Sequence, residues 1–351
     1  MIDKISLYQL KMPLKEPYHL SFVDLHHFDT FIAVVQSGGC TGIGEATPLP
    51  GYCDEDAEQV LAVAREVAPR LLAAGDAGSR DVLRPYIKKA PFAATLFLTA
   101  LETAGEEKGL GPVDMELVGI LSTGDHAEIS RQLPEMVSRG FKTIKVKVGK
   151  DVEADIAKIN YIQSIRPGGV VIRVDANQGY DYDQAVRFVK GVPPMGIELF
   201  EQPFPKGVWD EMKRLSEISP IPLMLDESIN TEEDLIRTIE LKCASYVKFK
   251  LMKAGSLANL ASLISIAREA GLKVVLGNGV AGEIGCYHEA VAATRVGLDN
   301  AGEMNGFLKL TESVLVSPLK YEAGKMKADQ SFEPRLDPER LAKYLVRELV
   351  W

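Results

Sequence analysis

The length, composition and charge of the chain narrow its class. It has 351 residues, of which 46% are hydrophobic and 25% charged, ordinary values for a globular protein. This length exceeds one typical domain, so we expect two domains or a barrel with an addition. The formal net charge is −9 and no long lysine and arginine cluster stands out, which argues against a nucleic-acid or anionic-membrane partner.

Cysteine usage and the N-terminal segment indicate a compartment. The four cysteines, Cys40, Cys53, Cys243 and Cys286, form no Cys-x-x-Cys pair, which is typical of free thiols in a reducing cytoplasm. The N-terminus lacks a basic segment followed by an apolar run, so no signal peptide is expected. No stretch approaches the ~18–20 apolar residues of a membrane helix. We therefore expect a cytoplasmic protein without a membrane partner.

Residues 1 to about 112 have the pattern of a small α+β domain. Strands are expected at 5–12 and 30–35, then a glycine turn and a returning strand at 41–46, because glycine supplies positive φ without steric cost. Two helices are expected next, since apolar residues recur there at helical spacing. They are 54–74 and 91–108.

From about residue 115, short β-rich runs alternate with helical runs. The polar residues that end five successive strands are 28, 26, 25 and 24 residues apart, and they are Lys147, Asp175, Glu201, Asp226 and Lys250. A β/α barrel spends about 250 residues on eight units, or about 31 each, so these spacings indicate compact barrel units. The expected strands are 116–121, 143–148, 170–175, 197–201, 222–226, 245–250, 273–277 and 300–303. The expected helices are 151–165, 181–190, 209–218, 231–241 and 256–270.

The alternative to a barrel is an open, doubly wound sheet. That fold would need a glycine-rich phosphate turn after an early strand, and the sequence has none. The tail should hold a strand at 319–322 and a helix at 338–347. We expect three parts: an α+β cap at 1–112, a barrel at 113–318, and a C-terminal segment at 319–351 that packs back on the cap.

Three carboxylates end consecutive expected strands. Asp175, Glu201 and Asp226 should meet at the carboxyl ends of the strands, where barrel active sites lie. Converging carboxylates repel one another and raise their pKa values, and a hard cation with oxygen ligands removes this repulsion. Mg²⁺ suits a sparse carboxylate set with open water positions. The alternative, that each acid caps the following helix, is weaker for three in a row.

Lysines flank these acids. Alternation along the second barrel strand places Lys145 and Lys147 on its inner face, and Lys250 ends the sixth strand, across the barrel mouth. A lysine acts as a base when neighbouring positive charge depresses its pKa. Ion pairing with the acids is the alternative role. Lys248 and Lys253 remain candidates beside Lys250.

The residues together resemble the enolase superfamily, in its muconate lactonizing enzyme subgroup. The matching segments are Lys145-Val-Lys147, Asp175-Ala-Asn177-Gln178-Gly179, Glu201-Gln202-Pro203, Asp226-Glu227-Ser228, Lys250-Leu-Met-Lys253-Ala-Gly255 and Gly42-Ile-Gly-Glu45-Ala-Thr-Pro48. The resemblance implies an α/β fold, a modified TIM barrel (β/α)7β with an N-terminal α+β capping domain. Because such enzymes are often dimers or octamers, it also implies a homo-oligomer.

The resemblance further implies the chemistry. The ligands of one Mg²⁺ would be Asp175, Glu201 and Asp226. Lys147 and Lys250 would be acid/bases on opposite faces of a small carboxylate substrate, and Lys145 would assist electrostatically. Removal of the proton α to the carboxylate would give a metal-stabilised enediolate.

The reaction that follows is left open by the sequence. Two opposed lysines allow racemisation or epimerisation of an amino-acid derivative or dipeptide, our first hypothesis. The same pair allows a lyase of the superfamily: a cycloisomerase, an o-succinylbenzoate synthase-like enzyme, or a hydroxy- or imino-acid dehydratase. Dipeptide epimerases of the family carry Asp-x-Asp near strand eight, where this chain has Glu303-Met-Asn305. The family's Glu-Ser or Glu-Gly step after strand seven is also replaced, by Gly279-Val-Ala-Gly-Glu283-Ile-Gly285.

Substrate contacts are expected from two cap loops and from the barrel. In this family the loops contribute to specificity, and here they should be 18–29 and 50–55. The expected substrate-binding residues are Tyr18, Phe22, Tyr52, Asn177, Glu303 and Asn305. Gln202 and Glu227 stand next to expected metal ligands and should support them. For each aromatic loop residue, an ordinary surface or core role is the alternative.

Overall fold

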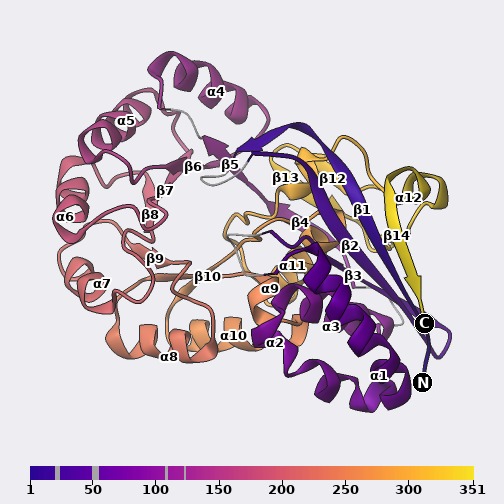
Figure 1. Cartoon of the computed structure of the whole chain (residues 1–351). Coiled ribbons are helices and arrows are strands. Elements are labelled where there is room, and N and C mark those ends of the chain that lie inside the picture. Colours follow the sequence, from indigo (N-terminus) through magenta and orange to yellow (C-terminus); the bar gives the residue numbers. More distant parts are fainter. Residues whose placement is uncertain (20–23, 50–54, 107–109, 122–123) are drawn as a thin grey trace.

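The structure, a computed structural model, combines a curled parallel sheet ringed by helices with a separate antiparallel sheet (Figure 1). It describes residues 1–19, 24–49, 55–106, 110–121 and 124–351. Phe22, Tyr52 and Cys53 lie outside these ranges. No helix in the described ranges is both long enough and apolar enough to cross a membrane.

The barrel is built on seven parallel strands, hydrogen-bonded in the order β11-β10-β9-β8-β7-β6-β5. In chain order they are β5 (Val118–Leu121), β6 (Thr143–Lys147), β7 (Val171–Asp175), β8 (Ile197–Glu201), β9 (Leu223–Leu225), β10 (Tyr246–Phe249) and β11 (Lys273–Leu276). Ile144 and Val146 of β6 are fully buried toward the helices, as the alternation predicts. The α/β barrel with an antiparallel cap sheet is therefore confirmed, with each of these strands within two residues of its predicted bounds.

The prediction of a last strand at 300–303 was wrong. This segment forms only an isolated bridge between Leu117 and Gly302. Gly302 N donates to Glu116 O at 2.8 Å, and Glu303 N donates to Leu276 O at 2.9 Å. Asparagine and glycine are poor strand formers, which accounts for the short pairing. The segment still joins β11 to β5 and completes the ring.

Helices cover the outer face of this ring (Figure 1). They are α4 (His126–Ser138), α5 (Val152–Ile165), α6 (Tyr182–Gly191), α7 (Trp209–Ser216), α8 (Glu232–Leu241), α10 (Leu257–Glu269) and α11 (Glu283–Arg295), whereas the short helix α9 (Leu251–Ala254) lies at the end of β10 against α3 (Pro91–Ala104) of the cap. Asp151 caps α5, while Asp181 and Thr231 make capping boxes at α6 and α8, which fixes where these helices begin. Helix α4 was not predicted.

The cap is an antiparallel sheet in the order β14-β1-β2-β3, covered by helices. Its N-terminal elements are β1 (Ile2–His19), β2 (Asp24–Ser37), β3 (Cys40–Ala46), α1 (Ala57–Leu83), α2 (Tyr86–Lys89) and α3 (Pro91–Ala104). Gly42 and Gly44 let α3 lie directly on β3, since a Cβ there would lie 1.9 Å from Ala100 O and 2.0 Å from Leu96 O. These glycines are thus required by packing.

The C-terminal residues contribute to two sheets. Strands β12 (Lys320–Glu322) and β13 (Lys325–Ala328) pair with β4 (Val113–Glu116) in a three-stranded sheet, so the expected strand 116–121 is divided at Leu117. Helix α12 (Pro338–Tyr344) is shorter than the predicted 338–347, because β14 (Leu345–Val350) follows it and pairs with β1. The domain boundaries at 112 and 318 stay predictions.

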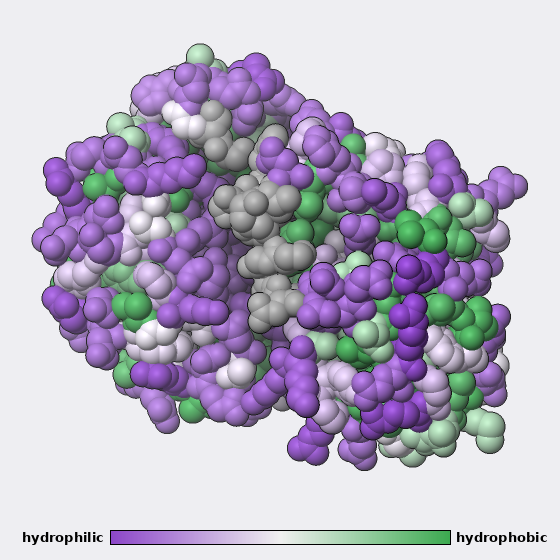
Figure 2. Space-filling view, in the orientation of Figure 1, coloured by the Kyte–Doolittle hydropathy of each residue, from purple (hydrophilic) through white to green (hydrophobic). Residues whose placement is uncertain are grey.

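The surface over the barrel helices is more hydrophilic than the surface on the cap side. Hydrophilic side chains dominate over the barrel helices, whereas hydrophobic ones gather on the cap side (Figure 2). Leu345, Val346 and Val350 of the edge strand β14 are among the exposed hydrophobic residues. Exposed edge strands are surfaces through which sheets associate. The expected homo-oligomer stays a prediction.

Candidate active site

Three carboxylates lie at the carboxyl ends of neighbouring barrel strands. Asp175 ends β7, Glu201 ends β8 in register beside it, and Asp226 directly follows β9. Their exposed fractions are 0%, 0% and 4%. The parallel register therefore brings together the three acids expected from sequence.

Two lysines of β6 face these acids from one side. Lys145 is buried, with Nζ 2.8 Å from Asp175 Oδ2 and 2.7 Å from Glu201 Oε2. Lys147 stands nearer the mouth, with a 40% exposed side chain and Nζ 2.7 Å from Asp175 Oδ2. The alternation that placed both lysines inward thus produces one enclosed and one accessible ammonium group.

The lysines of β10 approach from the other side. Lys250 Nζ lies 2.8 Å from Asp226 Oδ1. Lys248 is 1% exposed and donates to Glu201 Oε1 at 2.5 Å. Lys253 donates to the backbone carbonyls of Asp226 and Ile229 at 3.1 and 3.0 Å. Of these three lysines, Lys250 is the one whose ammonium group lies closest to the carboxylate of Asp226.

The two polar residues expected to hold a substrate amine, Glu303 and Asn305, contact other groups of the protein. Glu303, expected to hold a substrate ammonium, lies 3.1 Å from Lys145 Nζ and 2.8 Å from Lys248 Nζ. Asn305 donates to Val118 O at 3.3 Å and precedes the short 3-10 helix η1 (Gly306–Lys309). The Glu303 carboxylate therefore already has two cations.

Burial and crowded charges shift the pKa values of the site. Burial raises the pKa of Glu201, and the charge of Asp175 adds to this, so it reaches about 8. Burial opposes ionisation of Asp175 as well, but the lysines beside it hold its pKa well below the usual range. Burial lowers the pKa of Lys250, yet the carboxylate of Asp226 outweighs this and raises it. The carboxylate of Asp226 therefore favours the charged form of Lys250.

Strained turns follow two of the acids. Asn177, Gln178 and Gln202 have φ of 43°, 68° and 38°, a left-handed backbone that non-glycine residues rarely adopt and that clusters at functional sites. Asn177 accepts from Lys147 Nζ and donates to Glu227 Oε1 at 3.1 Å. The turn thereby connects an accessible lysine to a further acid, Glu227, which is half-buried.

Gln202 supports the backbone that carries Asp226. Its Oε1 accepts from Asp226 N at 3.0 Å and from Ser228 N at 3.2 Å. Its Nε2 donates to Phe204 O and to Ser228 Oγ, both at 2.8 Å. All four hydrogen-bonding positions of the Gln202 amide are therefore used, and they fix the end of β9 relative to the end of β8.

The cap residues expected to contact substrate are only partly described. Tyr18 and His19 end β1 and pair with Leu25 and Asp24 of β2, so the described residues of the expected loop 18–29 are strand residues. The Tyr18 ring stacks edge-on against Phe28 at 6.4 Å and lies 4.6 Å from Lys309 Nζ. Phe22 and Tyr52 fall outside the described residues.

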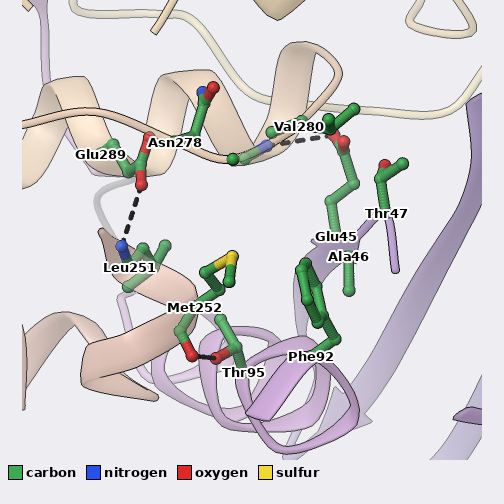
Figure 3. Close-up of a pocket in the computed structure, with 13 residues that line it drawn as sticks. Glu45, Ala46, Thr47, Phe92, Thr95, Leu251, Met252, Asn278, Val280 and Glu289 are labelled. Carbon is green, nitrogen blue, oxygen red and sulfur yellow. Dashed lines mark hydrogen bonds between the residues drawn. The ribbon is translucent and has the colours of Figure 1, made fainter. Parts of the chain in front are cut away.

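A pocket lies at the seam between cap and barrel, next to Lys250. Glu45 and Thr47 line it from the cap, while Asn278 and Glu289 line it from the barrel (Figure 3). Glu289 accepts from Leu251 N at 2.9 Å, directly after Lys250. Glu45 accepts from three backbone N–H groups at the start of α11, a contact that the sequence did not reveal. The cap therefore holds the start of α11, and Glu289 of the same helix holds the residue that follows Lys250.

The donor set fits Mg²⁺ in chemistry but not in arrangement. Asp175, Glu201 and Asp226 offer only buried carboxylate oxygens, which are the ligands that Mg²⁺ prefers. Within the described ranges, however, no three acidic, histidine or cysteine side chains are arranged to hold a metal ion. The ammonium groups of Lys145 and Lys248 lie between the carboxylates instead. A cation at this position would require both ammonium groups to withdraw.

The charges of the site balance. The carboxylates are those of Asp175, Glu201, Asp226, Glu227 and Glu303, and the ammonium groups are those of Lys145, Lys147, Lys248, Lys250 and Lys253. Five negative and five positive groups sum to zero when all are ionised. A divalent cation would leave two positive charges, which an anionic substrate could neutralise.

Comparisons with known proteins find relatives along nearly the whole chain. Residues 128–334 match the family model described as enolase C-terminal domain-like. An aromatic dipeptide epimerase from Herpetosiphon aurantiacus is 30% identical over 79% of this chain and 82% of its own.

Solved structures have the same architecture. The muconate lactonizing enzyme of Pseudomonas fluorescens, in complex with muconolactone, superposes with a TM-score of 0.85 at 27% identity, over 98% of this chain and 99% of that one. A dipeptide epimerase from Cytophaga hutchinsonii, solved with Mg and D-Ala-L-Val, has a TM-score of 0.88 at 20% identity, over 100% and 99%. At that identity, the second likeness concerns the fold alone.

Proposed function

Because this chain belongs to the muconate lactonizing enzyme subgroup of the mandelate racemase/muconate lactonizing enzyme family, in the enolase superfamily, we propose that it removes the proton α to a carboxylate. The observation that carries this proposal is the pair Lys147 and Lys250. They lie on β6 and at the end of β10, with β7, β8 and β9 between them, and each contacts a different acid. In a closed ring, this separation puts one amine on each face of a bound substrate.

Each lysine has a distinct task in the proposed reaction. One of the pair takes the α-proton, and the other can return a proton to the opposite face, which inverts the carbon. Lys145 stays charged beside the position of the substrate carboxylate and offsets the second negative charge of the enediolate. Mg²⁺ held by Asp175, Glu201 and Asp226 would supply Lewis-acid stabilisation of the same charge.

Racemisation or epimerisation of an amino-acid derivative or dipeptide is the reaction we propose. An acid/base on each face is what a 1,1-proton transfer requires, and the aromatic dipeptide epimerase relative supports it. The second candidate is a lyase or cycloisomerase of the superfamily. It is favoured by Glu303, whose carboxylate is taken up by Lys145 and Lys248 and so is not available to a free substrate ammonium.

Deuterium exchange tests the proposal. N-acyl amino acids, dipeptides and hydroxyprolines would be incubated with the enzyme and Mg²⁺ in D₂O, with proton NMR, optical rotation and ultraviolet absorbance as readouts. A racemase or epimerase washes deuterium into both stereoisomers, whereas a lyase accumulates an unsaturated, keto or cyclised product.

Lysine variants assign the two faces. Lys147→Ala and Lys250→Ala should each abolish inversion while keeping exchange for one stereoisomer only, because one base remains. Lys142→Ala is the matched control, since Lys142 pairs with Glu116 at the surface, at 2.6 Å, and precedes the same strand. Undiminished inversion in either Lys147→Ala or Lys250→Ala would refute the mechanism.

A further inference from the structure

Glu303 is bound to lysines on both sides of the barrel interior. Its Oε1 accepts from Lys145 Nζ at 3.2 Å, and its Oε2 accepts from Lys145 at 3.1 Å and Lys248 at 2.8 Å. Its side chain is 11% exposed. A substrate ammonium at this carboxylate would be a third cation, so a role in substrate recognition is not what these contacts favour.

The same two lysines occupy the space among the expected metal ligands. Lys145 contacts Asp175 and Glu201, and Lys248 contacts Glu201 and lies 3.5 Å from Asp226. Two ammonium groups and a divalent cation repel one another strongly at such distances. Either the lysines or the metal can therefore hold the carboxylates closely, but not both.

We propose that Glu303 is a positioning residue that receives Lys145 and Lys248 when a divalent cation binds, and so sets the affinity of the metal site. This inference rests on the proposed function, because it presumes that Asp175, Glu201 and Asp226 bind the cation. Glu303 is the only other acid that both lysines contact in the described chain. When they leave the three ligands, each ammonium group keeps a contact with the Glu303 carboxylate, so neither is left buried without an acid partner.

Calorimetric titration of metal-free enzyme with MgCl₂, without substrate, tests this role. Glu303→Gln keeps the shape but removes the charge, so the lysines have only the three ligands left as partners. The dissociation constant for Mg²⁺ should rise at least tenfold. A residue that serves only the substrate would leave it unchanged.

Asp155→Asn is the matched control for loss of one buried negative charge at the same end of the barrel. Asp155 accepts from Gly149 N at 2.8 Å and pairs with Lys158 at 3.0 Å, and it contacts neither Lys145 nor Lys248. Its dissociation constant should stay within about twofold of wild type, because the Coulomb effect of a more distant charge is small. Equal weakening in both variants would reduce Glu303 to a general charge effect and overturn the proposal.

Glu303→Asp covers the case in which Glu303→Gln does not fold. It keeps the charge but draws the carboxylate back by one methylene, so Mg²⁺ binding should weaken less than in the Gln variant, yet measurably. A wild-type dissociation constant in Glu303→Asp would contradict the inference. If the wild-type enzyme binds no Mg²⁺, the proposed metal site fails. If wild type binds and Glu303→Gln binds equally, only the role of Glu303 fails.

Discussion

Arg173 shows at the scale of a single residue how the barrel interior is held together. It is fully buried on β7, pairs through two nitrogens with Glu198 at 2.8 and 3.2 Å, and donates to Ala301 O at 2.8 Å. That carbonyl belongs to the short segment that closes the ring. The guanidinium of Arg173 therefore links β7 to the segment 300–303 that closes the ring.

Arg173→Met should lower the free energy of unfolding by about 1–3 kcal/mol, because it leaves the half-buried carboxylate of Glu198 and the carbonyl of Ala301 without this donor. Urea denaturation measures this. Arg187→Met is the control, since Arg187 pairs with Glu153 at 65% and 61% exposure and should cost less than about 1 kcal/mol. Equal losses in the two variants would show that the Arg173–Glu198 pair contributes no more to stability than an exposed ion pair.

Residue identity in the site was predictable where a strand period fixes direction. Alternation along β6 turns Lys145 and Lys147 inward, and strand spacing aligns the three acids. The partners of Glu303 were not predictable, because its lysines are 158 and 55 residues away and meet it only after the ring closes. The sequence pattern therefore predicted where Glu303 lies along the chain but not which side chains it contacts.

At the scale of elements, Glu45 connects the cap strand β3 to the barrel helix α11. It accepts from Gly282 N, from Ile284 N at 2.9 Å and from Gly285 N at 3.0 Å, near the positive end of the helix (Figure 3). Burial raises its pKa to about 7, although these donors lower it. A proton is thus retained on folding over a range in which the unfolded chain has lost it.

This shift predicts a pH dependence of stability. An acid whose folded pKa is raised loses stability as pH rises from about 4.5 to about 7, since the native state then holds the extra proton. Between pH 5 and pH 8, the free energy of unfolding of wild type should fall by about 2 kcal/mol more than that of Glu45→Gln. Any pH-independent effect of the amide substitution drops out of this comparison. Denaturant unfolding of both proteins at both pH values measures it. Parallel profiles would show that Glu45 does not titrate between them.

Elements were predictable from local patterns and missed where pairing is remote. Caps and apolar spacing set α5, α6 and α8 to within a residue or two. The predicted helix 338–347 ended early because Leu345–Val350 pairs with β1, more than 300 residues away, and supplies the missing strand of the cap sheet. No local signal distinguishes that segment from a continuing helix.

At the scale of the whole molecule, Mg²⁺ should couple the site to global stability. A ligand that binds only the folded state stabilises it by RT ln(1 + [L]/Kd), or about 2.7 kcal/mol at 100 times Kd. The proposed ligands come from three separate strands, so the cation would join β7, β8 and the end of β9. It would also relieve the repulsion between Glu201 and Asp175.

Urea unfolding with saturating MgCl₂, with EDTA, and with NaCl at matched ionic strength tests this coupling. Wild type should gain stability with MgCl₂ alone, because screening by NaCl acts on exposed charges and not on this buried cluster. Glu201→Gln should show no gain, since one anionic ligand is lost. An equal gain in Glu201→Gln would place the stabilising cation elsewhere on the protein.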